Sequence, residues 1–347
     1  MKIGIVTFYG LYNYGNRLQN YAVQEILKKE GFDSETVVLV DSIIQRIGVH
    51  SLKLLLSRLH VSKYVRYSNF WKFDRRYIKT RFITKNKIPN LYKDYCAFAA
   101  GSDQIWNPNL DMNLDYYFLR FAQENQRIAM VPSMAVDAMP ENKVNSYKKY
   151  LNGFNKLAVR EESAKDIIAD LIGKSAEVLI DPTMALNRTE WKKIINCRKV
   201  PSDKYWVLYY LGDCRYNEQI KKKALENNAK LINLMNAADD YYVSSPDMFV
   251  SLIMNADLVL TDSFHAVAFS INFNIPFYVM RRVSKDSVCS NMFSRIESLL
   301  EHYCLMDRTE DNLFRAKTID YAIVNKILDD DRVKFLDYFR NILADCK

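Results

Sequence analysis

Short apolar runs alternate with amphipathic stretches along the chain. Residues 2–8 (KIGIVTF) predict a buried strand, and residues 17–32 predict a helix that stops at Gly31. Residues 34–40 (SETVVLV) predict the next strand. Because a strand, a loop, a helix and a second strand in this order open doubly wound folds, the pattern indicates an α/β domain.

The pattern of residues 51–82 is typical of helical structure, with a cluster of basic residues and an apolar stripe. From Lys53 to Lys87 the chain carries eleven Lys and Arg residues, and Asp74 is the only acid there. Such a positive segment attracts phosphates, whether of an anionic membrane surface or of a diphosphate-linked substrate. A solvated helix face without a partner is the other interpretation.

Three apolar runs of the first half end in polar turns: CAFAAGSDQIW, RIAMVPSMAV with Ser133, and KLAVREES. Asp103, in the first of these turns, is a candidate general base, or else it caps the residues that follow it. Arg160, in the third, suits bidentate binding of a carboxylate or phosphate. An ordinary ion pair with Glu161 or Glu162 is the alternative for Arg160.

The loop of residues 9–17 (YGLYNYGNR) is a further candidate binding segment. Its glycines allow a ligand to approach the backbone, which makes Gly15, Asn16 and Arg17 candidate substrate-binding residues. The loop does not match G-x-G-x-x-G, so the dinucleotide-binding fingerprint is absent from it.

The second half repeats the alternation, with strands predicted at 204–213 and 229–235 and a helix opened by Ser245 and Pro246. We therefore expect domains at 1–187 and 188–347, with C-terminal helices that pack back on the first domain. The predicted fold class is α/β, with two Rossmann-like domains facing a cleft as in glycosyltransferase-B folds.

The segment ADLVLTDSFHAVAF is the most informative candidate for a catalytic site. A buried strand ends at Asp262, and Ser263 and His265 lie in the first turn of the helix that follows. A helix amino end favours an anion, and a histidine there can also move a proton. Capping or packing is the alternative role for His265. Arg281 or Arg282, just after the next strand, can add positive charge.

Length and composition fit a two-domain protein of 347 residues. The start lacks the pattern of a signal peptide, and no apolar run is long enough to span a membrane, so we expect a cytoplasmic protein. The six cysteines have no metal-type spacing, so we expect free thiols and no metal site. No nucleic-acid-binding module is present, so we expect no nucleic-acid partner.

Taken in order, several segments resemble the polysaccharide pyruvyl transferase family. These segments are NYGNRLQNYAVQEILKKEGF, GSDQIWNP, AVREESA, IDPT, TDSFHAVAFSINFNIPF and NMFSRIESLLEHYCLMDR, within residues 3–308. One departure is Ala266, where the family's S-F-H motif usually continues with Gly.

The resemblance implies transfer of pyruvate from phosphoenolpyruvate to a sugar as a ketal, with Arg160 and His265 in the donor site. It implies a donor side in the second domain, an acceptor side in the first, no cofactor, and an acceptor sugar on a lipid diphosphate. Two rival interpretations are a nucleotide-sugar-dependent glycosyltransferase of the same architecture and a non-catalytic glycan-binding relative. Binding of phosphoenolpyruvate rather than a nucleotide sugar, and release of phosphate, separate the three.

Overall fold

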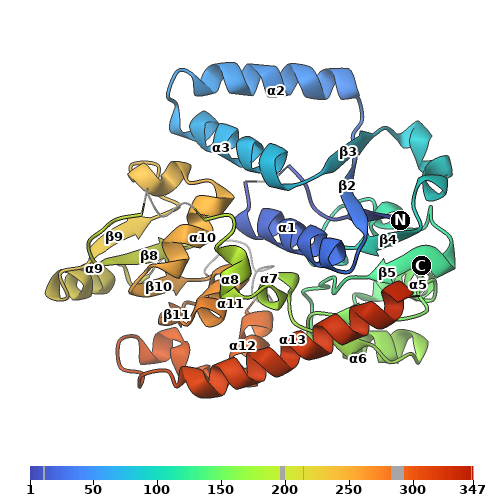
Figure 1. The fold of residues 1–347 in the computed structure, drawn as a ribbon. Helices are drawn as coiled ribbons and strands as arrows, with labels where there is room; N and C mark the ends of the chain where they lie inside the picture. Colours follow the sequence, from blue (N-terminus) through green and yellow to red (C-terminus); the bar gives the residue numbers. More distant parts are fainter. Residues whose placement is uncertain (11, 196–199, 214, 283–292, 345, 347) are drawn as a thin grey trace. The chain divides into compact units, whose positions relative to one another are not determined.

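The computed structural model describes residues 1–10, 12–195, 200–213, 215–282, 293–344 and 346 (Figure 1). The chain divides into two compact units. The first unit comprises residues 1–52, 74–185 and 330–347, and the second comprises residues 53–73 and 186–329. The change near residue 185 lies close to the predicted boundary at 187, but residues 53–73 cluster with the second unit and residues 330–347 with the first.

A parallel five-stranded sheet forms the centre of the first unit, in the order β3-β2-β1-β4-β5. A parallel two-stranded sheet, β6-β7, belongs to the same unit. The strands are β1 Lys2–Val6, β2 Asp33–Leu39, β3 Thr80–Ile83, β4 Ala97–Ala100, β5 Arg127–Ala129, β6 Ala158–Val159 and β7 Glu177–Val178. The helices that lie wholly in the unit are α1 Tyr14–Lys29, α4 Leu114–Tyr117, α5 Val144–Leu151, α6 Glu162–Ile172 and α7 Pro182–Ala185.

The second unit holds a parallel four-stranded sheet in the order β11-β10-β8-β9. Its strands are β8 Tyr205–Tyr209, β9 Lys230–Asn233, β10 Leu258–Thr261 and β11 Phe277–Val279. Its helices are α8 Arg188–Trp191, α9 Asn217–Glu226, α10 Pro246–Met254, α11 Phe264–Phe273 and α12 Ser294–His302. Three further helices contribute residues to both units, namely α2 Ile43–Ser57, α3 Ser62–Tyr77 and α13 Tyr321–Ala344. Short 3₁₀ helices lie at Lys85–Asp94, Glu124–Gln126, Glu141–Lys143, Asp240–Val243, Met306–Arg308 and Glu310–Asn312.

The predicted α/β class and its two Rossmann-like units are confirmed by these parallel sheets. Apolar side chains pack against each of the two larger sheets, as is typical of parallel sheets. In the first core, Trp106 stacks on Phe118 with ring centroids 4.6 Å apart. In the second core, Leu260 of β10 packs with Trp206 of β8 and Tyr278 of β11.

Local signals set several of the helix ends. Asn13 caps α1 by accepting a hydrogen bond from the backbone N–H of Asn16, and Gly31 follows α1 with a φ of 86°. Ser245 precedes α10, with Pro246 at its first position. The stop at Gly31 and the start at Ser245 are predicted from neighbouring residues, but α1 begins at Tyr14, so Gly15 and Asn16 lie in the helix and not in the predicted loop.

The helical prediction for residues 51–82 is correct for the end of α2 and for α3, and it is wrong at the turn of residues 58–61 and at β3. The segment contains the end of α2, a turn at residues 58–61, α3, and the edge strand β3. His60 sits in this turn with a φ of 56°, a conformation that ends helical geometry. Thr80 of β3 pairs with Thr36 of β2, and a partner so distant in sequence leaves no local helix-or-strand signal.

Candidate functional site

Both larger sheets have a switch point, where neighbouring strands lead to connections on opposite sides. In the first unit it lies between β1 and β4, and in the second between β8 and β10. Ligands of open α/β sheets bind beyond the carboxyl ends of the strands at such points. Asp103 follows β4, and Ser263 and His265 follow β10, so these predicted residues lie beside a switch point.

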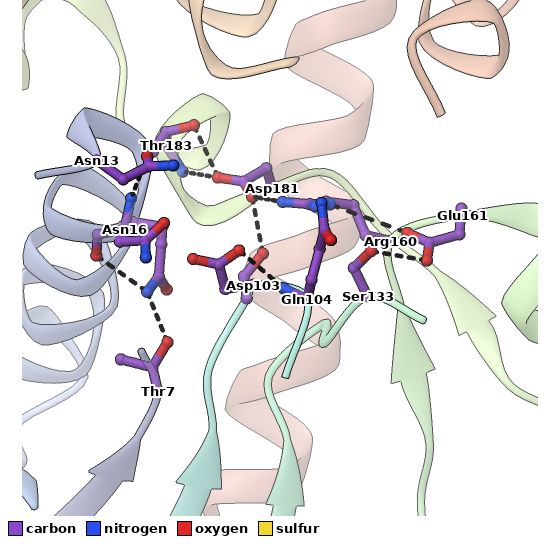
Figure 2. Close-up of polar contacts among 12 residues, drawn as sticks. Thr7, Asn13, Asn16, Asp103, Gln104, Ser133, Arg160, Glu161, Asp181 and Thr183 are labelled. Carbon is purple, nitrogen blue, oxygen red and sulfur yellow. Dashed lines mark hydrogen bonds and ion pairs between the residues drawn. The ribbon is translucent and has the colours of Figure 1, made fainter. Parts of the chain in front are cut away.

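At the first switch point the backbone after β4 approaches the end of β1 closely. A Cβ placed on Gly101 would lie 2.8 Å from the Cβ of Thr7. The Thr7 hydroxyl accepts a hydrogen bond of 2.7 Å from Gln19 Nε2 of α1 (Figure 2). A larger residue at position 101 would therefore clash with Thr7. The glycine allows the turn at Ser102–Asp103 to lie close to the end of β1.

Arg160, directly after β6, is buried among carboxylates (Figure 2). Its Nη1 donates to Asp181 Oδ2 at 2.7 Å, and its Nε lies 3.9 Å from Glu161 Oε2. Burial lowers the pKa of Arg160, but the charges of Asp181, Glu161 and Asp103 together raise it above its usual value. The guanidinium therefore stays positively charged. Its Nη1 and Nε are directed at the carboxylates of Asp181 and Glu161.

Asp181 organises this cluster from the end of β7. Its Oδ2 also accepts from the Ser102 hydroxyl at 2.7 Å, and its Oδ1 accepts from the backbone N–H and the hydroxyl of Thr183. One buried carboxylate thus joins the turn after β4, the end of β6 and the start of α7. In the sequence, the only signal for Asp181 is its place in the motif IDPT, which belongs to the resemblance.

The predicted residues Asp103 and Ser133 lie in the same network. Asp103 Oδ1 accepts from the backbone N–H of Gln104 at 2.8 Å, as the capping alternative expected, and the Asp103 carbonyl accepts from the N–H of Ser133. The Ser133 hydroxyl donates to Glu161 Oε1 at 2.8 Å. Asp103, Ser133 and Arg160 are therefore brought together in the first unit.

The segment that carries Ser133 has an unusual backbone. Val131 and Ala135 have φ values of 49° and 53°, which side chains with a Cβ rarely adopt. Glu161 Oε1 accepts the backbone N–H groups of Met134 and Ala135 at 2.7 and 3.0 Å. Such strain persists only where the surroundings impose it, and here Glu161 does so.

Gly15, Asn16 and Arg17 form the first turns of α1, and all three are buried. Arg17 Nε pairs with Asp74 Oδ1 at 2.8 Å, and its guanidinium lies 4.9 Å from the centre of the Tyr9 ring. Burial raises the pKa of Asp74 in spite of Arg17. The charge of Arg17 is thus paired with a buried carboxylate of the protein. Its contact with Tyr9 fixes the loop that leads into α1.

In the second unit, Ser263 is the N-cap of α11, and His265 lies in its first turn. His265 is 9% exposed. Within the described residues, the Ser263 side chain makes no capping hydrogen bond to the helix. Ala266 is not among the residues with positive φ, so its methyl group costs no backbone strain where the family usually has Gly. The amino end of this helix provides N–H groups and positive dipole charge to an anion.

Asp262 joins the strand ends around α11. Its two carboxylate oxygens accept from the backbone N–H groups of Leu211 and Gly212, each at 2.8 Å. Arg282 Nε donates to Asp262 Oδ2 at 3.0 Å, and Arg282 Nη2 donates to the Asp262 carbonyl. The Asp262 carboxylate therefore binds the backbone that follows β8, and Arg282 neutralises its negative charge.

Two more arginines belong to this edge of the second sheet. The half-exposed Arg281 contacts Glu310 and Asp311 at 3.3 and 3.2 Å, which directs its guanidinium toward these two acids. Arg295 of α12 is buried, with its guanidinium 5.9 Å from the centre of the Phe264 ring at the start of α11. In the sequence, Arg295 is marked only by its place in the motif NMFSRIESL.

The described residues contain no cluster of three or more His, Cys, Asp or Glu side chains arranged to hold a metal ion. Cys96, Cys304 and Cys346 are free thiols. Among the same residues, no helix combines the length and the hydropathy that a membrane-spanning segment needs.

Comparison with solved structures finds distant similarity over nearly the whole chain. A putative UDP-N-acetylglucosamine 2-epimerase from Listeria monocytogenes is 13% identical with a TM-score of 0.47, covering 96% of this chain and 95% of its own. MnaA from S. aureus, solved with UDP, is 12% identical with a TM-score of 0.47, covering 99% and 98%. MurG from Acinetobacter baumannii is 9% identical with a TM-score of 0.45, covering 99% of each chain.

No curated protein matches the sequence. A family model does match it, over residues 13–282, which is well over half of the chain. The matched region includes Arg160, Asp181, Asp262 and His265 and so contains the centres of both candidate sites. The description of that model is polysaccharide pyruvyl transferase, and the chain belongs to this family.

Proposed function

We propose that the chain is a pyruvyltransferase that moves the pyruvyl group of phosphoenolpyruvate onto two hydroxyls of a sugar. The observation that carries the proposal is the amino end of α11, where His265 and Arg295 accompany a buried helix end. Phosphoenolpyruvate carries a carboxylate and a phosphate, and cationic groups together with a helix amino end match both.

The reaction needs an acid, a base and charge stabilisation. A proton adds to the methylene carbon of phosphoenolpyruvate, and the first sugar hydroxyl attacks the adjacent cationic carbon. Inorganic phosphate then leaves, and the second hydroxyl adds to the same carbon to close the ketal. Of the two protons lost by the hydroxyls, one replaces the proton given to the methylene carbon, and the other leaves with phosphate.

His265 is the proposed acid, because its imidazole lies in the first turn of α11, beside the proposed anion site. Ser263 and the backbone N–H groups of that turn are proposed to bind the donor's oxygens. Arg295 is proposed to supply the positive charge, whereas Arg282 is paired to the buried carboxylate of Asp262 and is proposed to fix the helix end. Arg281, held by Glu310 and Asp311, is assigned a weaker, outer contribution.

The first unit is proposed to hold the acceptor. Asp103 is the proposed base for the attacking hydroxyl, and Gly15, Asn16 and Ser133 are proposed to line the acceptor site. Arg160 and Arg17 are each paired to a buried carboxylate, so we propose that they position the neighbouring segments rather than clamp the donor. No cofactor enters the proposed reaction.

We further propose that the acceptor is a sugar of a lipid-diphosphate-linked oligosaccharide and that the reaction occurs in the cytoplasm, during synthesis of a bacterial surface or exopolysaccharide. Family membership supports the sugar acceptor. The basic residues from Lys53 to Lys87 are compatible with a diphosphate substrate.

The test incubates the protein with phosphoenolpyruvate and a panel of lipid-linked sugars, and reads the product by mass and free phosphate by a colour assay. The proposal predicts a pyruvyl ketal and one phosphate for each ketal formed. His265→Ala should lose at least about a hundredfold in turnover, as expected for a general acid. His302→Ala, on the exposed end of α12, is the matched control and should retain full activity. Ketal formation by His265→Ala at the unchanged rate would remove His265 from the mechanism.

A further inference from the structure

Helix α2 presents an apolar stripe to solvent. No residue of Ile43–Ser57 is buried, and Ile44 is 83% exposed, while Ile47, Leu52 and Leu55 are 58–59% exposed. Positions 44, 47, 48, 51, 52 and 55 share one face of a helix, because side chains three or four residues apart lie above one another. Gly48 and Ser51 are the other residues of that face, so it carries no charge.

The opposite side of α2 is engaged with aromatic rings. The Arg46 guanidinium lies 3.2 Å from the centre of the Phe82 ring, and Lys53 Nζ lies 4.9 Å from the centre of the Tyr67 ring. These contacts are attractive cation–π interactions. They fix the rotation of the helix, so the apolar stripe is the side turned away from these rings.

The sequence around the stripe is uniformly basic. Residues 42–73 contain no Asp or Glu. Their basic side chains are Arg46, Lys53, Arg58, Lys63, Arg66 and Lys72. Arg58, Lys63 and Lys72 are exposed, and Leu59 beside Arg58 is 69% exposed. A partner for this surface must therefore offer both an apolar phase and negative charge.

We propose that the apolar stripe of α2 docks the protein onto an anionic lipid bilayer, with the helix lying in the interfacial plane. The acyl region accepts Ile44, Ile47 and Leu55, and anionic headgroups attract Arg58 and Lys63. A second copy of the chain fits less well, since a symmetric contact through α2 would bring identical basic segments together. A nucleic acid supplies the negative charge but no apolar surface for the isoleucines.

The inference goes beyond the proposed function and does not depend on it, because the site on α2 takes part in no chemical step. The experiment uses the full chain and sediments it with phosphatidylcholine vesicles, with and without phosphatidylglycerol, at low and high salt. Neither phosphoenolpyruvate nor a sugar is present. A negative result therefore removes the docking surface and leaves the pyruvyl transfer reaction to its own test.

Two double variants separate the two forces. Ile44→Glu with Leu55→Glu introduces charge into the stripe, and Arg58→Glu with Lys63→Glu reverses the flanking charge. Leu225→Glu is the matched control, because Leu225 is a 78% exposed leucine on α9. All of these side chains are exposed, so circular dichroism melts should match those of the wild type.

The expected result is salt-sensitive binding of the wild type and of Leu225→Glu to vesicles with phosphatidylglycerol. Each double variant should partition at least about tenfold more weakly. Absence of wild-type binding at low salt, or equal binding by the stripe variant, overturns the proposal. Ultracentrifugation without lipid gives a further check. A concentration-dependent dimer that the stripe variant abolishes would contradict docking onto a bilayer. It would show that the stripe binds a second copy of the chain.

Discussion

Asp262 and Arg282 form an ion pair in which Arg282 Nε lies 3.0 Å from Asp262 Oδ2. The same carboxylate accepts the backbone N–H groups of Leu211 and Gly212. One side chain therefore connects the ends of β8, β10 and β11 at the switch point of the second sheet. Because α11 begins two residues after Asp262, this ion pair also fixes the helix end at which we place the donor.

The first prediction concerns this connection. Asp262→Asn keeps the shape of the side chain but removes its charge, so the hydrogen bonds from Leu211 and Gly212 weaken and Arg282 loses its partner. We expect the free energy of unfolding to fall by about 2–4 kcal/mol, measured by urea denaturation. Arg281→Met is the control and should change it by less than about 1 kcal/mol, since the Arg281 side chain is itself 48% exposed. An equal loss in both variants would contradict the organising role of Asp262.

The second prediction concerns the buried cluster of the first unit. Asp181→Ala leaves the Arg160 guanidinium buried without its 2.7 Å partner and also frees Ser102 and Thr183. We expect a loss of about 3–5 kcal/mol in the free energy of unfolding. Replacing both ends of the ion pair, Asp181→Ala with Arg160→Met, should recover part of the loss. A double variant no more stable than Asp181→Ala would show that the buried charge is not the cause.

The third prediction concerns the strained segment at Val131–Ala135. Glu161→Ala removes the acceptor of the Met134 and Ala135 amides, so this segment should open more often. We expect hydrogen exchange of these two amides to accelerate by about 10- to 100-fold, as the loss of a charge-assisted hydrogen bond implies. Glu162→Ala changes the exposed neighbour, which pairs with Lys165, and should leave both amides protected.

The fourth prediction is a pH dependence at Asp74, whose pKa is raised chiefly by burial. A raised folded-state pKa means that the folded protein binds the proton more tightly than the unfolded chain. The contribution of Asp74 to stability should therefore increase as the pH falls from above the raised pKa toward 3.8, the ordinary value. Urea denaturation of wild type and Asp74→Asn across this range measures the difference.

Asp33 provides the opposite control for this measurement. Its hydrogen bond with Lys79 lowers its pKa, so the stability it contributes is present above pH 3.8 and is lost as the pH falls through the lowered value. The difference between wild type and Asp33→Asn should therefore shrink on acidification, where that for Asp74→Asn grows. If the two stability differences changed in the same direction with pH, both assignments would be contradicted.

The sequence predicts the fold class because the signals are local. The apolar strand of β10 and the start of α11 at Ser263 need only neighbouring residues to be recognised. The edge strand β3 and the clustering of residues 53–73 with the second unit depend on partners far away in the chain. Arg66, for example, donates to the carbonyl of Leu234, a contact that no periodicity reveals.

The same distinction applies to the candidate sites. Asp103, Ser133 and Arg160 could be selected because each follows an apolar run, and the structure brings them into one network. The ion pair of Arg160 with Glu161 that the sequence suggests is present at 3.9 Å, but the shorter contact is with Asp181, twenty-one residues further on. A pattern identifies residue types at strand ends, but the pairing depends on which strand ends are neighbours.

The central claim is that the amino end of α11 binds phosphoenolpyruvate beside His265. The chain has four histidines, so the imidazole signals can be assigned with single His→Gln variants and followed by nuclear magnetic resonance. On addition of phosphoenolpyruvate, we predict a saturable shift of the His265 signals, while the signals of exposed His302 stay in place. Unchanged His265 signals at saturating phosphoenolpyruvate would contradict the account.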